Sequence, residues 1–182
     1  MRETNFLRLV SQRRSVRRYK RLPVEKEKLL VCLEAARLAP SACNAQPYKF
    51  IVVDDPAAKD ALAAAAFSGL HSATKFAAQA GALIAIVSRK GKLSAWLGNQ
   101  VQDTNFRLVD IGIAAEHFVL AAEEQGLGTC WLGWFDAKGA GKALGLPAGC
   151  KAEIMLSVGY PDEAPPARRK KTLEEISSFN RY

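Results

Sequence analysis

The sequence predicts one domain that combines helices with a central sheet. Four short stretches, residues 49–54, 82–87, 129–132 and 152–159, are apolar enough to be buried strands. Segments with helical periodicity separate these stretches along the chain. With 182 residues, no internal repeat and no linker, the chain has the length expected of a single domain, residues 1–182.

The first half of the chain predicts three helices. Residues 4–12 carry apolar side chains at helical spacing after Thr4, a suitable N-cap. Residues 24–38 form a longer amphipathic helix, which Pro40 ends because proline cannot continue the backbone hydrogen-bond ladder. Residues 55–66 begin with Asp-Pro, a capping carboxylate followed by proline at the first helical position. Residues 68–79 fit neither a helix nor a strand pattern clearly.

The second half predicts the central helix of the fold. Residues 105–125 form the longest helical pattern, and its apolar surface is nearly continuous, so we expect it to be buried. Residues 136–145 predict a short helix capped by Asp136. The tail, residues 161–182, is polar and basic and has no core of its own.

The amino-acid composition restricts which class of protein this chain can belong to. Hydrophobic residues make up 49% and charged residues 24%, as in ordinary globular proteins. No apolar run reaches the roughly 18 residues of a membrane helix, and the N-terminus lacks the apolar core of a signal peptide. We therefore expect a soluble, cytoplasmic protein without a membrane partner. The four cysteines form no CxxC pair and the two histidines show no ligand spacing, so we expect free thiols and no metal.

Positive charge is concentrated at the two ends of the chain. Residues 1–28 carry ten Lys and Arg against three acids, a balance of +7. Residues 29–167 carry eleven against thirteen, a balance of −2, and residues 168–182 carry five against two, a balance of +3. Two interpretations are open: two nucleic-acid-binding arms, or two parts of one anion site that the fold brings together.

Residues 12–19, which we call the arginine turn, concentrate four arginines and a serine in eight positions. Arginine presents a planar fork of donors suited to phosphate, and a nearby hydroxyl adds another donor. One hypothesis is that this turn holds the phosphate of a cofactor. The alternative is a solvated basic surface.

Familiar catalytic and nucleotide-binding motifs are absent from the sequence. It contains no GxxxxGK[ST], no GxGxxG after a strand and no GxSxG. Hydrogen-bond donors remain, in the arginine turn, in the loop that carries Ser41, Asn44 and Gln46, and in the basic run 168–171. This set suits binding of a flat, anionic molecule, which points to a cofactor that carries the chemistry.

Four segments, in this order, resemble the signatures of the FMN-dependent nitroreductase family. They are RRSVR at 13–17, APSACNAQP at 39–47, GLGTCWLGWF at 126–135 and KKTLEEI at 170–176. The resemblance implies an α+β fold, with a mixed β-sheet flanked by helices, in an intertwined homodimer. It also implies two FMN molecules at the dimer interface.

The resemblance also implies which residues bind the cofactor. Arg13 and Ser15 would face the phosphate and ribityl chain, and Arg17 the pyrimidine edge of the flavin, where a cation stabilises the reduced ring. Arg14 belongs to the same motif, although we expect it and Arg18 to face solvent or to form ion pairs.

The remaining cofactor contacts come from three other segments of the chain. Ser41 and Asn44 would come from the partner subunit or line the other side of the ring. Leu132 and Gly133 would approach the ring with backbone atoms, as a glycine permits. Arg168 and Lys170 would close on the phosphate, which places the basic tail, residues 168–182, on the cofactor or the partner.

The implied activity is hydride transfer from NADH or NADPH through flavin N5 to a nitroaromatic, quinone or similar acceptor, by a ping-pong mechanism. No side chain need act as a catalytic acid or base. Relatives that perform reductive dehalogenation or flavin breakdown are an alternative. A basic nucleic-acid-binding module is an alternative of another class, and it predicts colourless protein with salt-dependent binding. The span 89–100 is short, so we expect a small lid over the substrate.

Overall fold

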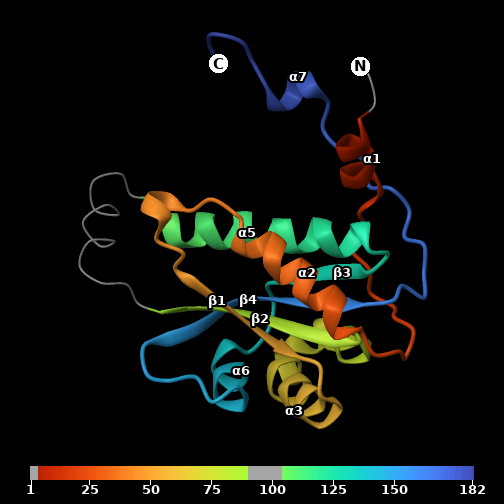
Figure 1. Ribbon diagram of the computed structural model, residues 1–182, viewed down its shortest axis with the longest axis vertical. Helices are drawn as coiled ribbons and strands as arrows, with labels where there is room; N and C mark the ends of the chain where they lie inside the picture. Colours follow the sequence, from red (N-terminus) through yellow and green to blue (C-terminus); the bar gives the residue numbers. More distant parts are fainter. Residues whose placement is uncertain (1–3, 90–103) are drawn as a thin grey trace.

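The computed structural model describes residues 4–89 and 104–182, and it consists of a four-stranded sheet between two helical layers (Figure 1). The strands lie in the order β1-β2-β4-β3. Their bounds are Tyr48–Val53 for β1, Ala82–Arg89 for β2, Gly128–Leu132 for β3 and Cys150–Gly159 for β4. The α+β architecture is therefore confirmed. The expected lid falls mostly on residues 90–103, outside the described residues.

The sheet is antiparallel rather than mixed. All three strand pairings among the described residues run antiparallel, and the one parallel contact is an isolated bridge between Ser15 and Thr129. The family resemblance implied a mixed sheet in an intertwined homodimer. The described residues of one chain form a purely antiparallel sheet, apart from that single parallel bridge.

Two helices cover one face of the sheet. Helix α5, Phe106–Glu124, lies across this face beside α2, Lys26–Arg37 (Figure 1). Seven residues of α5 are buried, which confirms the prediction of a central helix. Its Phe118 stacks on Phe50 of β1 with 6.0 Å between ring centroids, and together these contacts form one half of the core.

The other face carries shorter elements. They are α3, Pro56–Ala66, the 3-10 segment η2, Gly69–Gln79, and α6, Ala137–Ala143. Asp55 and Asp136 cap α3 and α6 through their side chains, as the sequence predicted. The segment with no clear periodicity is η2, whose i-to-i+3 winding does not produce the α-helical repeat.

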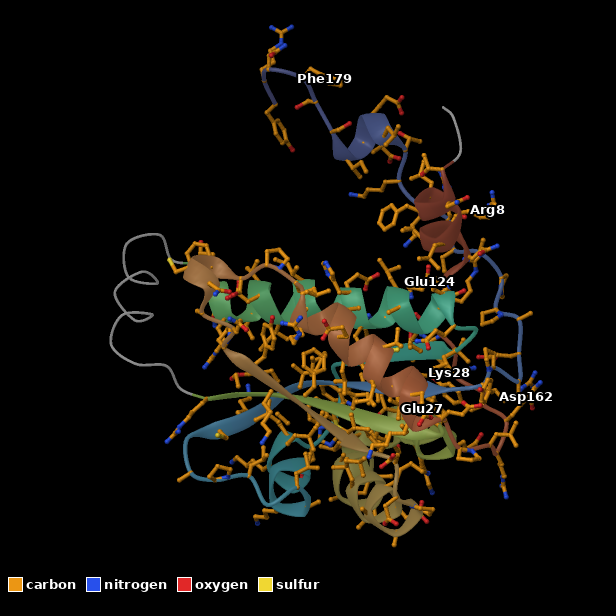
Figure 2. All side chains as sticks on the ribbon, in the orientation of Figure 1. Arg8, Glu27, Lys28, Glu124, Asp162 and Phe179 are labelled. Atoms are coloured by element: carbon orange, nitrogen blue, oxygen red, sulfur yellow. The ribbon has the colours of Figure 1, made fainter. Side chains whose placement is uncertain are left out.

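The chain ends leave the layered body on the same side. Helix α1, Asn5–Gln12, is capped by Thr4 and buries none of its residues. The C-terminal tail passes α1, forms the short helix α7, Leu173–Ile176, and runs away from the sheet (Figure 1). Phe179 on this tail is 89% exposed and lies far from the body (Figure 2). None of the described helices has the length and apolarity needed to cross a membrane.

Candidate functional site

Two buried side chains fix the arginine turn to the sheet. Val16 and Tyr19 are each only 3% exposed, and they flank Arg17 and Arg18, which are exposed. The Val16 N–H donates to the Thr129 carbonyl at 2.9 Å, and the Tyr19 hydroxyl donates to the Val16 carbonyl at 2.6 Å. The Tyr19 hydroxyl also lies 2.8 Å from Ser157 Oγ, and burial raises the pKa of Tyr19. The backbone of the turn is therefore rigidly held.

Arg13 and Arg17 present guanidinium groups that the chain uses only in part. Arg13 Nε lies 3.8 Å from Glu116 Oε1 on α5, a long ion pair. The Arg17 guanidinium lies 6.0 Å from the centre of the Phe76 ring, and its Nη1 donates to the Ser15 carbonyl at 3.3 Å. Both guanidiniums therefore retain free N–H groups for an anion.

Arg14 has a different role. Its Nη1 lies 2.6 Å from the Ser11 carbonyl, 3.0 Å from the Gln12 carbonyl and 3.0 Å from the Arg13 carbonyl. A cation at this position satisfies carbonyl groups at the end of α1 that have no partner within the helix. Arg14 therefore stabilises the junction of α1 with the arginine turn.

Glu163 holds the arginine turn from the other side, and nothing in its local sequence indicated this. Its Oε1 accepts the backbone N–H groups of Arg17 at 2.5 Å and Arg18 at 3.1 Å. The neighbouring Asp162 N–H donates to the Arg18 carbonyl at 2.9 Å, and Asp162 lies at the end of the sheet (Figure 2). The start of the tail is thus hydrogen-bonded to the turn.

A cleft of about 300 Å³ opens between the turn and the start of the tail. Its lining includes Arg14, Glu123 and Glu163. Burial raises the pKa of Glu123, while Arg13 and Arg14 act in the opposite direction. Two carboxylates make this cleft a poor place for a phosphate.

The loop with Ser41 and Asn44 is anchored separately, on the N-terminal half of α5. Its 3-10 turn η1, Ala42–Asn44, is held by Asp110, which is buried and accepts the Ala42 N–H at 2.9 Å. Ser41 Oγ accepts the Gln46 N–H at 3.0 Å. The loop has left-handed backbone at non-glycine residues, with φ of 52° at Cys43 and Asn44 and 44° at Gln46. Such conformations cost free energy and are found at binding sites more often than elsewhere.

A single chain does not bring all the predicted residues together. The loop touches α5 at Asp110 and the arginine turn touches it at Glu116, about 9 Å apart along the helix axis. Arg168 and Lys170 are exposed on the tail, which runs past α1 (Figure 1). The arginine turn and the loop therefore contact α5 at different points, and no hydrogen bond or ion pair among the described residues joins them.

Leu132 and Gly133 differ in exposure at the end of β3. Leu132 is buried and pairs with Met155 of β4, whereas Gly133 is exposed. A Cβ at Gly133 would lie 3.6 Å from Ile154 Cδ1, an ordinary contact, so packing within the chain does not require glycine there. The sheet bridge between Ser15 and Thr129 places the arginine turn at the opposite end of this strand.

The chemistry of the site is that of anion binding. The arginine turn offers free guanidinium N–H groups and the Ser15 hydroxyl. Its carboxylate contacts are the long ion pair of Arg13 with Glu116 and the bonds from Glu163 to backbone N–H groups. Cys130 lies close by, and burial raises the pKa of its thiol although Arg17 and Arg13 lower it. A thiol in this state is a weak nucleophile.

Comparison with known proteins gives one consistent result. A model of the nitroreductase family matches residues 10–160. A protein of Archaeoglobus fulgidus named putative NADH dehydrogenase/NAD(P)H nitroreductase is 32% identical over 161 residues, which cover 86% of each chain. The iodotyrosine deiodinase of Thermotoga neapolitana is 25% identical over 194 residues, which cover 96% of this chain and 97% of that protein.

A solved structure agrees with the sequence matches. The FMN-dependent nitroreductase of Clostridium difficile R20291 superimposes with a TM-score of 0.76 at 32% identity. The match covers 96% of this chain and 98% of that one. Fold and sequence therefore indicate the same family over nearly the whole chain.

Proposed function

Because the chain belongs to the nitroreductase family, we propose that it is a homodimeric FMN-dependent oxidoreductase. It takes electrons from NADH or NADPH and delivers them to a small acceptor such as a nitroaromatic or a quinone. The observation that carries this proposal is the arginine turn, which is rigidly held while Arg13 and Arg17 keep free N–H groups. A solvated basic surface would not need such fixed backbone geometry.

The residues of the turn fit the chemistry of FMN. Arg13 and the Ser15 hydroxyl would hold the phosphate and ribityl chain, because a guanidinium fork and a hydroxyl are suitable donors to phosphate oxygens. Arg17 would lie at the pyrimidine edge, where its charge favours the reduced, anionic form of the ring. FMN, when bound, supplies the hydride-accepting and electron-donating chemistry that side chains lack.

A second copy of the chain would complete the site. The loop with Ser41 and Asn44 lies apart from the arginine turn of its own chain, so in the proposed dimer it serves the turn of the partner. Large apolar side chains are exposed on the elements that would form the interface: Phe6, Leu7 and Val10 on α1, Leu30 and Val31 on α2, and Leu108 and Val109 on α5. Exposed apolar side chains grouped in this way mark protein interfaces.

Other parts of the chain would orient and enclose the reactants. Gly133 is exposed and leaves room for close approach to its backbone. We propose that nicotinamide and acceptor occupy the same position in turn. Neither needs a side-chain acid or base, because water or the flavin itself can supply the protons. In this scheme Arg168 and Lys170, which are exposed on the tail, close on the phosphate in the assembled dimer.

The test is steady-state kinetics of the FMN-loaded protein. NADH or NADPH is varied at several fixed concentrations of a quinone such as menadione, and initial rates are measured. One shared site predicts parallel lines in double-reciprocal plots. Failure of the FMN-loaded protein to oxidise either nicotinamide would overturn the proposed activity, and intersecting lines would overturn the alternating use of one site.

A further inference from the structure

Trp134 combines exposure with a fixed orientation. Trp134 is 59% exposed in the part of the chain that the structure describes. Its indole Nε1 nevertheless donates a hydrogen bond to the Leu70 carbonyl at 2.9 Å. The single proton of the Thr74 hydroxyl is shared between the His71 carbonyl at 2.8 Å and the Trp134 carbonyl at 2.9 Å, which holds Thr74 against the Trp134 backbone. The His71 ring lies 5.2 Å from the Trp134 ring at an interplanar angle of 47°. Three residues of η2 therefore hold one exposed aromatic face.

These contacts are not explained by packing of the core. The next residue, Phe135, enters the core and anchors this part of the chain, so Trp134 is free to face outward. Exposed large side chains are ordinarily mobile, and a ligand that orders them must offset the lost entropy. A tryptophan whose N–H is already bonded has lost most of this freedom before any ligand arrives.

The position of Trp134 links it to the proposed cofactor site. The same segment η2 carries Phe76, on which the Arg17 guanidinium rests at 6.0 Å. Thr74 and Phe76 are two residues apart, which corresponds to about 4 Å along a 3-10 helix. Trp134 also directly follows Gly133. Arg17 and Trp134 are thus held by adjacent parts of one element.

We propose that Trp134, supported by His71, is a platform that stacks planar aromatic electron acceptors. This rests on the proposed function and names the substrate class: flat aromatic rings with an extended π face, in preference to acceptors without one. Aromatic rings favour offset or tilted stacking, and an indole offers the largest apolar face of any side chain. Trp134 is a specificity-determining residue in this proposal, and electron transfer itself does not require it.

The test compares two acceptors in the FMN-loaded protein. 4-Nitrobenzoate has a flat aromatic ring, and ferricyanide accepts electrons without stacking. Trp134→Leu should raise the KM for 4-nitrobenzoate about tenfold with little change in kcat, because a stacked pair is lost. Its kinetics with ferricyanide should equal those of the wild type. Trp134→Phe keeps an aromatic face and should restore most of the affinity.

Leu70→Ala is the matched control. It removes a side chain that is 88% exposed and leaves in place the Leu70 carbonyl that accepts the Trp134 N–H. The KM and kcat for both acceptors should therefore equal those of the wild type. Circular dichroism and FMN content check that each variant is folded. If Trp134→Leu does not fold, Trp134→Gln replaces it.

Three results would overturn the platform. The first is that Trp134→Leu reduces 4-nitrobenzoate with the kinetics of the wild type. The second is that the substitution lowers kcat/KM equally for both acceptors. The third is that the variant dissociates into monomers, which would make Trp134 a contact between copies. Failure of the proposed function is distinct, because the wild-type protein with FMN would then not reduce ferricyanide at all. That result would also overturn the role proposed for Trp134.

Discussion

The four arginines of the arginine turn differ in how many of their guanidinium N–H groups already bond to other residues of the chain. Arg14 lies against three carbonyls at the end of α1, and Arg18 Nε donates to the Asp162 carbonyl at 2.7 Å. Arg13 has a long ion pair with Glu116 and Arg17 rests on a ring. The arginines with spare donors are those that the family resemblance assigned to FMN, which the sequence spacing alone could not distinguish from the others.

Arg13→Ala should weaken FMN binding by about tenfold to a hundredfold, because a charged hydrogen bond contributes roughly 1.5–3 kcal/mol. The dissociation constant can be measured from the quenching of FMN fluorescence. Arg21→Ala is the control, since it removes the same charge from an exposed position just beyond the turn. Equal effects of the two substitutions would show that only the overall charge matters, which would contradict the role proposed for Arg13.

Cys32 gives a residue-scale prediction on pH. It is fully buried, and burial raises the pKa of its thiol from 9.0 to about 11. The unfolded chain loses this proton first as pH rises, so the stability that depends on it is present below about pH 9 and is lost towards about pH 11. The free energy of unfolding, measured in urea, should therefore fall across this range.

The contribution of Cys32 is isolated by difference, because other buried groups also titrate at high pH. Cys32→Ala should lose less stability than the wild type between about pH 9 and about pH 11, even though its stability is lower at neutral pH. Cys43→Ala, at an exposed thiol, should follow the wild type. Parallel pH curves for Cys32→Ala and the wild type would refute the assignment.

At the scale of elements, the arginine turn depends on the beginning of the tail. The Lys20 N–H donates to the Tyr160 carbonyl at 2.9 Å, and Tyr19 bridges to Pro161. Glu163 then closes this short ribbon by accepting the N–H groups of Arg17 and Arg18. The geometry of the arginines proposed to bind FMN is thus set by a segment about 145 positions away.

Glu163→Ala should weaken FMN binding more than Glu163→Gln does. Both substitutions remove a negative charge near the proposed phosphate site, but only glutamine keeps an oxygen that can accept the two N–H groups. Amide hydrogen exchange at Arg17 and Arg18 should accelerate in the alanine variant. Asp162→Asn is the control, because the bonds from Asp162 to the turn come from its backbone. Identical FMN affinities of the alanine and glutamine variants would contradict the proposal that Glu163 positions the arginine turn.

Periodicity and caps were sufficient to predict most elements. The predicted helices at 24–38 and 105–125 are observed at Lys26–Arg37 and Phe106–Glu124, and the last strand at Cys150–Gly159. The 3-10 winding of η2 could not be predicted, because it does not produce the apolar repeat of an α-helix. Glu163 was missed because its role depends on a pairing between the two ends of the chain.

At the scale of the whole molecule, several features of one chain have no counterpart within that chain. The arginine turn and the loop of Ser41 and Asn44 contact α5 at different points. Apolar side chains of α1, α2 and α5 face solvent, and the tail ends in exposed Phe179 and Tyr182. The sequence indicated the basic charge at both ends of the chain, but only the structure shows that the tail leaves its own domain. A second copy would account for each of these features.

Sedimentation velocity, followed by protein absorbance and by visible flavin absorbance, tests the central claim of an FMN site shared between two copies. A shared site predicts one yellow species with twice the 19.8 kDa mass of the chain and about one FMN per chain. A colourless protein that sediments as a monomer, and remains so after FMN is added, would contradict it.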